Sequence, residues 1–247
     1  MNRILLACDL DNTLLHSHRL RQAGDVCIEW FEGREQSFLD PAACRLLPQV
    51  LQALCLVPVT TRSVEQYRRI RWPAGCTPAL ALAANGAVLL RGGEPDQAWQ
   101  GTDCAVPYLP ELKRLHALLA EEGGYRACRI VDGAYLFAAW EAEEEALQCA
   151  GKHPTSLTAA VSGRKVYFLP PGVDKGLALR RLQAALDASR VLAAGDSQLD
   201  LSMLNAAHLA LVPDSRLARQ VEGAVAVCPP GERFAHFILD TALAEAR

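Results

Sequence analysis

Two carboxylates, Asp9 and Asp11, directly follow an apolar run at the start of the chain. The run, residues 4–8, is typical of a buried parallel strand, and in open α/β sheets chemistry takes place just outside the carboxyl ends of the strands. Two acids one residue apart repel each other, so this position calls for a cation. Mg²⁺ meets the need, because it prefers hard oxygen ligands from carboxylates and phosphates. The segment therefore suggests a metal-dependent enzyme that acts on a phosphate group.

Three further groups of polar residues stand where a predicted strand ends or a predicted helix begins. They are Thr60-Thr61-Arg62, Lys175, and Gly195-Asp196-Ser197-Gln198-Leu199-Asp200. Because parallel strands end at the same edge of a sheet, we expect these groups to converge there. Phosphoryl transfer needs such a set: a nucleophile, a metal, and cationic or hydrogen-bonding groups around the phosphoryl oxygens.

Alternating strands and helices are predicted in two stretches of the chain, before residue 91 and after residue 171. The predicted strands cover 3–9, 57–60, 79–84, 191–194, 209–212 and 224–227, and the predicted helices 41–54, 63–70, 174–188, 199–207, 216–221 and 233–246. This alternation indicates a doubly wound parallel sheet in the α/β class. Within the first stretch, residues 14–38 are polar, with a hairpin predicted over 26–31 and 36–39, and Asn85-Gly86 predicts a second hairpin turn.

The middle of the chain has a different pattern. A linker predicted from 92 to 110 is followed by a helix over 111–122, strands over 126–131 and 134–139, a helix over 141–150, and strands over 157–162 and 165–169. The order αββαββ indicates an α+β unit of its own. We therefore expect a core made of residues 1–91 and 171–247, interrupted by an inserted domain of residues 92–170.

These four groups resemble the four motifs of haloacid dehalogenase (HAD) superfamily phosphatases. The resemblance rests on the DxDxT segment of residues 9–13, on Thr60, on Lys175 and on the GDxxxD segment of residues 195–200. The inserted αββαββ unit resembles the smaller C2 cap, the C2B form, of sucrose-phosphate and mannosyl-3-phosphoglycerate phosphatases. The resemblance implies a Rossmann-like core with an inserted cap domain.

By this resemblance, Asp9 is the nucleophile that forms an aspartyl-phosphate, and Asp11 is the general acid and then the base that activates water. Thr60 hydrogen-bonds the phosphoryl oxygens, and Lys175 offsets the charge of the nucleophile and the phosphate. The implied cofactor is Mg²⁺, held by four residues: Asp9, the backbone carbonyl of Asp11, Asp196 and Asp200.

Three residues beside these motifs, Thr61, Arg62 and Asn85, are candidates for substrate binding, and for Arg62 and Asn85 a purely local structural role is an equal alternative. The sequence also departs from the family pattern. Leu199 replaces a common Asn, and Thr61 and His208 stand where relatives often have Gly. None of these departures removes a proposed catalytic group.

The resemblance implies hydrolysis of a small phosphorylated metabolite, a sugar phosphate or a phosphorylated glycoside. A phosphomutase of the phosphomannomutase type is an alternative, because it retains the same nucleophile and acid/base. A non-catalytic binding protein with the HAD fold is a second alternative, which Leu199 mildly favours.

The composition of the chain indicates which binding partners and which cellular compartment to expect. With 247 residues, 51% apolar content and a net charge of −3, the chain is typical of a soluble globular protein, with neither nucleic acid nor a membrane surface as partner. No secretory signal or membrane-spanning run is evident. The nine cysteines form no CxxC pair, which favours reduced thiols in the cytoplasm. No pattern indicates an oligomeric state.

Overall fold

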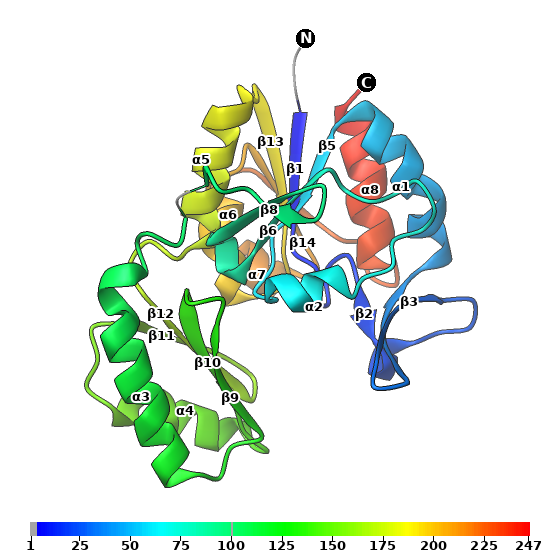
Figure 1. The fold of residues 1–247 in the computed structure, drawn as a ribbon. Helices are drawn as coiled ribbons and strands as arrows, with labels where there is room; N and C mark the ends of the chain where they lie inside the picture. The colour runs from blue at the N-terminus through cyan, green and yellow to red at the C-terminus, as the bar shows by residue number, and fades with distance from the viewer. Residues whose placement is uncertain (1–3, 100) are drawn as a thin grey trace.

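Five parallel strands form the central sheet of the computed structural model, which describes residues 4–99 and 101–247. The strand order is β15-β14-β13-β1-β5, so the first strand of the chain lies inside the sheet (Figure 1). The strands are β1 (Ile4–Cys8), β5 (Cys55–Pro58), β13 (Arg190–Ala194), β14 (Leu209–Val212) and β15 (Val225–Val227). All of these pairings are parallel, which places the carboxyl ends of the strands at one edge.

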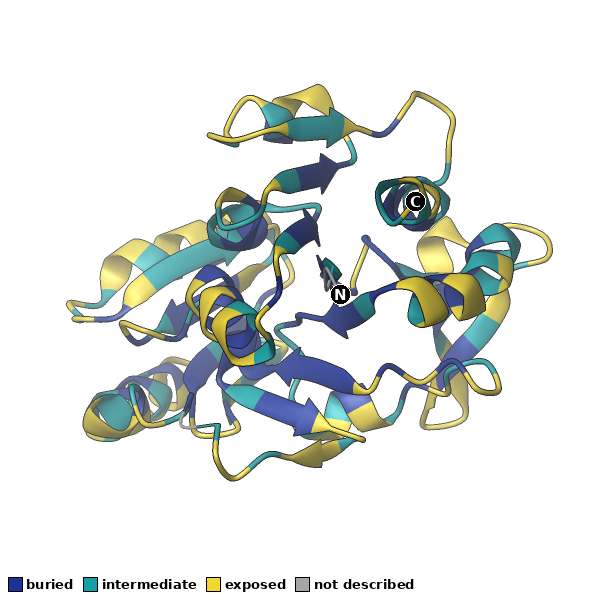
Figure 2. Ribbon diagram, turned by 90° about the horizontal axis from the view of Figure 1, so that it is seen from above, coloured by how far each residue is buried: buried dark blue, intermediate teal, exposed yellow. Residues whose placement is uncertain are grey.

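Helices cover both faces of this sheet. One face packs against α1 (Pro41–Ala53) and α8 (Phe234–Glu245). The other packs against α5 (Lys175–Leu186), α6 (Leu201–Asn205) and α7 (Ser215–Ala218). Figure 2 shows the buried strands between these more exposed helices. The predicted doubly wound parallel sheet is therefore confirmed.

The alternation of side chains within β1 explains why both layers form. Leu6 and Cys8 belong to the core on the α1 and α8 side, whereas Leu5 and Ala7 belong to the core on the α5 side. A strand that is buried on both faces is apolar throughout. Asp9 is the first polar residue after β1, so the strand places this carboxyl group at the edge of the sheet.

A short hairpin extends the sheet beyond β5. Its first strand, β6 (Leu80–Ala83), joins the sheet through a parallel bridge between Val59 and Leu82. The chain then turns through η2 (Ala84–Gly86) into β7 (Val88–Arg91), which pairs with the short β8 (Glu94–Pro95). The hairpin predicted at Asn85-Gly86 is confirmed, and it is closed by positive φ angles at both residues, 58° and 92°.

A small three-stranded sheet lies between β1 and α1. Its order is β2-β4-β3, formed by β2 (His16–Ser17), β3 (Val26–Phe31) and β4 (Arg34–Leu39), with a single turn η1 (His18–Leu20) after β2. The predicted hairpin is thus confirmed. The sequence did not predict β2, because a strand of two residues is too short to show a periodic pattern. We refer to β2–β4 as the hairpin sheet. The short helix α2 (Val64–Arg68) follows β5.

The middle of the chain forms a separate antiparallel sheet backed by two helices, coloured green in Figure 1. Its elements are α3 (Leu109–Glu122), β9 (Ala127–Val131), β10 (Tyr135–Ala139), α4 (Glu143–Lys152), β11 (Thr158–Ser162) and β12 (Lys165–Leu169). The strand order is β11-β12-β10-β9. This is the predicted αββαββ unit, called the cap below. The predicted linker before it contains β8 and the turn η3 (Val106–Tyr108), while Gln100 lies outside the described residues.

Each face of the cap sheet has its own partner. One face carries Leu136 and Phe168, which pack against α3 and α4. On the opposite face, Tyr135 and Tyr167 pack against the core residues Ala84 and Val173. The described residues include no helix that has both the length and the apolar character needed to cross a membrane.

Two hydrogen bonds tie the cap to the segment after β5. The Tyr135 hydroxyl donates to the backbone oxygen of Thr61. The backbone nitrogen of Val64, the first residue of α2, donates to the carboxylate of Asp132 at 2.9 Å. These contacts hold the cap sheet over the carboxyl edge of the core sheet.

Candidate active site

A buried lysine joins two of the predicted site carboxylates. Lys175 is the first residue of α5, where Asp174 caps the helix by accepting a hydrogen bond from the Leu177 backbone nitrogen at 2.8 Å. Its Nζ donates to Asp9 Oδ1 and to Asp200 Oδ1, each at 2.6 Å. The lysine is 2% exposed and Asp200 is fully buried. Residues that are far apart in the sequence therefore form one ion-paired cluster.

Asp200 uses its oxygens within the protein. Oδ1 accepts from Lys175, while Oδ2 accepts from the backbone nitrogens of Asp196 and Ser197 and from the Ser197 hydroxyl. These bonds shape the loop after β13 and hold Asp196 toward Asp9. Among the described residues, the Asp196 side chain itself accepts one hydrogen bond, from the Thr13 hydroxyl at 3.3 Å. Asp196 thus keeps oxygen lone pairs that a ligand can use.

The cluster holds more negative charge than Lys175 balances. Burial raises the pKa of Asp9 to about 8, although Lys175 acts to lower it and Asp200 adds to the increase. Burial also raises the pKa of Asp196 to about 6, with Asp200 as the next cause. Burial alone would lower the pKa of Lys175, but the carboxylates of Asp200 and Asp9 outweigh it, so this lysine stays charged.

The donor set fits a divalent cation. One oxygen from each of Asp9, Asp196 and Asp200 lies within 4.8 Å of the others. Carboxylate oxygens are the ligands that Mg²⁺ prefers, and a bound cation would offset both the burial of these carboxylates and their mutual repulsion. Asp9 and Asp196 offer free oxygens for such an ion, whereas Asp200 supports them through the loop and through Lys175.

Asp11 has a different partner from its neighbour Asp9. The guanidinium of Arg62 donates to both oxygens of Asp11, from Nε at 2.9 Å and from Nη2 at 2.6 Å. Burial acts to raise the pKa of Asp11, but the paired charge of Arg62 outweighs it and holds the pKa below its ordinary value. The pKa values of the two acids that follow β1 are therefore shifted in opposite directions, that of Asp9 upward by burial and that of Asp11 downward by Arg62.

The hairpin sheet fixes Arg62 from the other side. Glu29 on β3 accepts from Arg62 Nη1 at 2.8 Å and from Arg69 Nε at 3.2 Å. Ser37 on β4 donates to Glu29 and accepts from Arg62 Nη2 at 3.0 Å. Both Glu29 and Ser37 are buried. Sequence analysis missed these two residues, because neither stands at a predicted strand end or in a motif.

The remaining candidates are Thr60, Thr61, Arg62 and Asn85, and they differ in whether they line a cavity at the site. Thr60 is fully buried, and its hydroxyl accepts from the Arg62 backbone nitrogen at 3.1 Å. Thr61 and Arg62 line the cavity described below. Asn85 is also buried, but it lies in the η2 turn and donates to the Val173 backbone oxygen at 3.1 Å, and it lines neither cavity at the site. The structural role considered for Asn85 is the one that this geometry favours.

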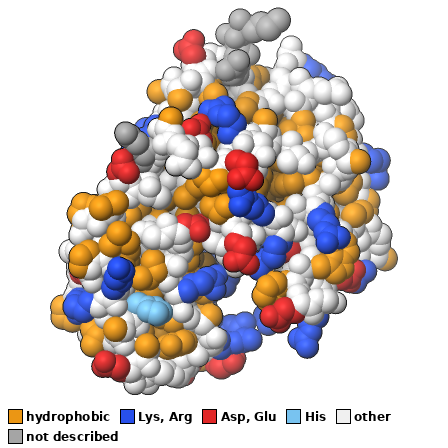
Figure 3. Space-filling view, in the orientation of Figure 1, with side chains coloured by type: hydrophobic (Ala, Val, Ile, Leu, Met, Phe, Trp, Pro, Cys, Tyr) orange, Lys and Arg blue, Asp and Glu red, His pale blue; other side chains and the backbone are white. Residues whose placement is uncertain are grey.

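Two connected cavities lie between core and cap. A small one of about 60 Å³ is lined by Asp9, Lys175 and Asp196 from the core and by Lys165 and Tyr167 from the cap. A larger one of about 510 Å³ extends from it between the hairpin sheet, α2 and the cap sheet. Asp11, Asn12 and Thr61 line both. Figure 3 shows the hollow between the cap and the hairpin sheet, with several Lys and Arg side chains around it.

Comparisons with known proteins show which solved structures share this fold. No protein-family model and no curated protein matches the chain. Solved structures match it over nearly its whole length. Sucrose-phosphatase from Synechocystis sp. PCC6803, solved with sucrose and phosphate, covers 100% of this chain and 98% of its own, at 20% identity and a TM-score of 0.66. A haloacid dehalogenase-like hydrolase from B. subtilis covers 96% of this chain and 99% of its own, at 19% identity and a TM-score of 0.66.

The chain has the haloacid dehalogenase (HAD) fold. Trehalose-6-phosphate phosphatase from Aspergillus fumigatus matches as well, at 13% identity and a TM-score of 0.57, covering 98% of this chain and 93% of its own. At such identities the likeness concerns the HAD fold. The roles of individual residues are therefore argued below from the geometry of the cluster.

Proposed function

We propose that the protein is a Mg²⁺-dependent phosphatase that hydrolyses a small phosphorylated metabolite, with a sugar phosphate as the leading class. The observation that carries the proposal is the Lys175 bridge between Asp9 and Asp200, with Asp196 beside it, at the carboxyl edge of a HAD-fold sheet. The structural likeness to sucrose-phosphatase and trehalose-6-phosphate phosphatase supports the sugar-phosphate class. The proposed division of the chain is a core of residues 1–91 and 171–247 and a cap of residues 92–170.

The geometry supports a two-step displacement. Asp9 attacks phosphorus and forms an aspartyl-phosphate, while Asp11 protonates the leaving oxygen. Asp11, now a carboxylate, then takes a proton from the water that cleaves the aspartyl-phosphate, which releases inorganic phosphate and regenerates Asp9. Lys175 stays charged beside Asp9 and offsets the negative charge of the phosphoryl oxygens. When bound by Asp9, the Asp11 backbone carbonyl and Asp196, with Asp200 in support, Mg²⁺ supplies further charge neutralisation.

The cap contributes side chains to this site on the side opposite the core sheet. Tyr167 and Lys165 line the small cavity opposite Asp9, so the cap limits the access of water to the reacting atoms. Thr61 lines both cavities and Arg62 lines the large one, which suits contacts with the substrate. The part of the chain that the structure describes contains no disulfide bond, which supports a reducing, cytoplasmic setting.

The test is release of inorganic phosphate from p-nitrophenyl phosphate with and without Mg²⁺. We expect hydrolysis that depends on Mg²⁺ and is abolished by Asp9→Asn, which also forms no phosphoenzyme. Asp11→Asn forms some phosphoenzyme with this good leaving group but releases it slowly. Asp187→Asn, the same change at the exposed end of α5, is the matched control and retains activity. Absence of turnover with any phosphate ester would contradict the proposal and favour a binding protein.

A phosphomutase is separated from a phosphatase by its product. The purified protein is mixed with a hexose phosphate, and the products are analysed for the isomer and for inorganic phosphate. A phosphatase releases phosphate, whereas accumulation of the isomer without phosphate would establish the mutase.

A further inference from the structure

The large cavity carries more positive charge than its own carboxylates balance. Six cationic side chains line it: Arg19, Arg62, Arg69, Arg129, Arg164 and Lys165. The lining includes two carboxylates, Asp11 and Glu29, and both are already bonded to Arg62. Lys165 from the cap also acts on Asp11, but the cations that line the cavity still outnumber its carboxylates.

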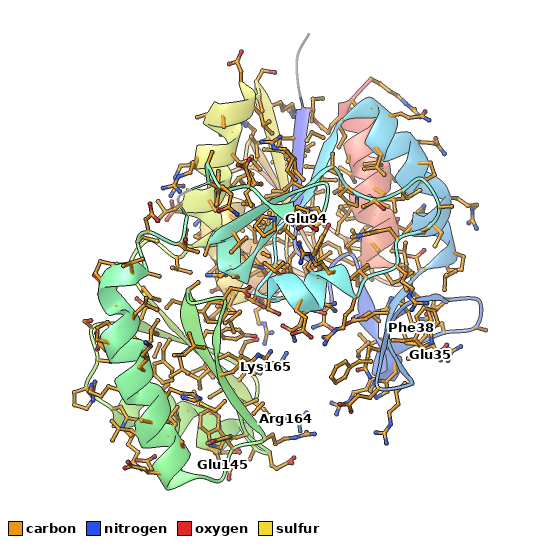
Figure 4. The ribbon with its side chains drawn as sticks, in the orientation of Figure 1. Glu35, Phe38, Glu94, Glu145, Arg164 and Lys165 are labelled. Atoms are coloured by element: carbon orange, nitrogen blue, oxygen red, sulfur yellow. The ribbon has the colours of Figure 1, made fainter. Side chains whose placement is uncertain are left out.

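The cap sheet aims two of these cations at the core. Arg129 on β9 stands opposite Phe137 on β10, which in turn stands opposite Tyr167 on β12. Partners in register share a face of a sheet, and so do residues two apart on one strand. Lys165 therefore lies on the same face as Tyr167, which is the face that packs toward the core. Figure 4 shows Arg164 and Lys165 extending from the cap toward the hollow in front of the hairpin sheet.

Neither Arg129 nor Lys165 forms an ion pair with any residue that the structure describes. The Arg129 guanidinium instead lies over the Phe137 ring, 4.7 Å from its centroid, which fixes its orientation. Other cap cations have carboxylate partners: Arg126 pairs with Glu141 at 3.2 Å, and Lys152 pairs with Glu122 at 2.8 Å. The cap thus leaves unpaired two cations that face the cavity.

The position of the cavity determines which part of a substrate meets these cations. Lys165 and Tyr167 line the small cavity beside Asp9 as well as the large one, so the two are continuous. A phosphoryl group beside Asp9 directs the rest of the ester into the large cavity. Its volume of about 510 Å³ suits a small metabolite.

We propose that the substrate's leaving group carries a second anionic group, a carboxylate or a second phosphate, and that Arg129 and Lys165 bind it. This inference rests on the proposed phosphatase function. An arginine whose guanidinium is fixed by an aromatic ring offers two parallel donors to a planar carboxylate or to a phosphate, and a lysine adds a point charge. A neutral sugar leaves both cations unmatched.

Binding is measured first, so that the test does not depend on turnover. Isothermal titration calorimetry with the full-length Asp9→Asn protein compares two matched pairs, glycerol phosphate against phosphoglycerate and a hexose monophosphate against a hexose bisphosphate. We expect the member with the second anion to bind at least tenfold more tightly in one pair or both. The first pair reports on a carboxylate and the second on a phosphate, so the pair that responds identifies the group.

Variants then locate the site. We expect Arg129→Gln and Lys165→Gln each to reduce the preference for the doubly anionic ligand by about tenfold, and the double variant to abolish it. Tenfold corresponds to about 1.4 kcal/mol. Lys113→Gln removes a cap charge from α3, on the far side of the cap sheet, and leaves the preference unchanged. Because the readout is a ratio between two ligands, a general loss of phosphate binding does not imitate the result.

The same ratio is measured in kcat/KM with the wild-type enzyme. The inference is overturned if the ligand without the second anion is preferred in both pairs, or if the preference for the second anion survives in the double variant. Hydrolysis of p-nitrophenyl phosphate would in that case leave the proposed function standing. Conversely, absence of all hydrolysis contradicts the proposed function, and the calorimetric ratio still decides the anion site.

Discussion

Replacing Lys175 with Met tests whether this lysine holds the carboxylate cluster together. The side chain is 2% exposed and contacts Asp9 and Asp200 at 2.6 Å each. Met is similar in length and leaves no large cavity, so the loss is mainly one of charge. Removing one partner of a buried ion pair typically costs about 3–5 kcal/mol. For a chain of 247 residues, that corresponds to a decrease in Tm of roughly 6–20 °C.

The loss of stability caused by Lys175→Met should increase with pH. In the native protein the pKa of Asp9 is about 8 and that of Asp196 about 6, both above the ordinary value of 3.8. A carboxyl group with a raised native pKa gives its full contribution to stability at low pH, and this contribution is lost as the pH rises through the native pKa. Lys175 lowers both pKa values, so Lys175→Met raises them further. We therefore expect a larger destabilisation at pH 9 than at pH 6.

Urea denaturation of the metal-free proteins at pH 6 and pH 9 measures both effects. Lys113→Met, an exposed lysine on α3, is the control and stays within about 0.5 kcal/mol of the wild type. The double variant Lys175→Met, Asp200→Asn should recover part of the loss, because it removes one of the uncompensated charges. A Lys175→Met protein within about 1 kcal/mol of the wild type at both pH values would refute the argument.

Three other predictions concern the neighbouring parts of the site. Arg62→Gln removes the charge that lowers the pKa of Asp11. The alkaline limb of kcat/KM for a hexose phosphate, where Asp11 loses the proton that it donates to the leaving oxygen, should therefore move up by about one pH unit or more. Arg62→Lys keeps the charge and should move this limb less, and an unchanged limb would contradict the pairing. The apparent affinity for Mg²⁺ should decrease as the pH falls below the Asp9 pKa of about 8, by up to about tenfold per unit, and more steeply below the Asp196 pKa of about 6. Calorimetry in two buffers measures the proton release on binding. Gly86→Ala places a methyl group against α5 at a φ of 92°, and should cost about 2–5 kcal/mol in urea denaturation, whereas Gly93→Ala, with open space at a φ of 85°, should cost about 1–2 kcal/mol.

Much of the core could be predicted because strands buried on both faces carry a plain signal. Leu5, Leu6, Ala7 and Cys8 are all fully buried, and such a continuous apolar run reveals both the strand and its end. The carboxyl edge then follows from parallel pairing alone, which brings Asp9 and Asp196 together. The same reasoning separated the cap, since its order of elements differs from that of the core.

The contacts that support the site residues from outside could not be predicted. They depend on packing between segments whose separation in the sequence follows no fixed pattern. Glu29 meets Arg62 only because the hairpin sheet folds back over the end of β5. Asp132 lies in the turn between β9 and β10, and its bond to the Val64 backbone nitrogen depends on how the cap settles on the core. Neither contact follows from strand periodicity or from a motif.

The two acids after β1 show what predicted and unpredicted contacts accomplish together. Asp9 contacts Lys175, from a core helix, and Asp11 contacts Arg62, which the hairpin sheet holds in place. Their pKa values are shifted apart, and such a separation gives two like groups distinct roles. In the protein alone the shifts oppose the proposed chemistry, which needs Asp9 ionised and Asp11 protonated. A divalent cation beside Asp9 lowers its pKa, and a phosphate oxygen beside Arg62 competes with Asp11 for the guanidinium. Each reversal would come from a ligand that the proposed reaction requires, so we expect the site to reach its reactive protonation state only when metal and substrate are both bound.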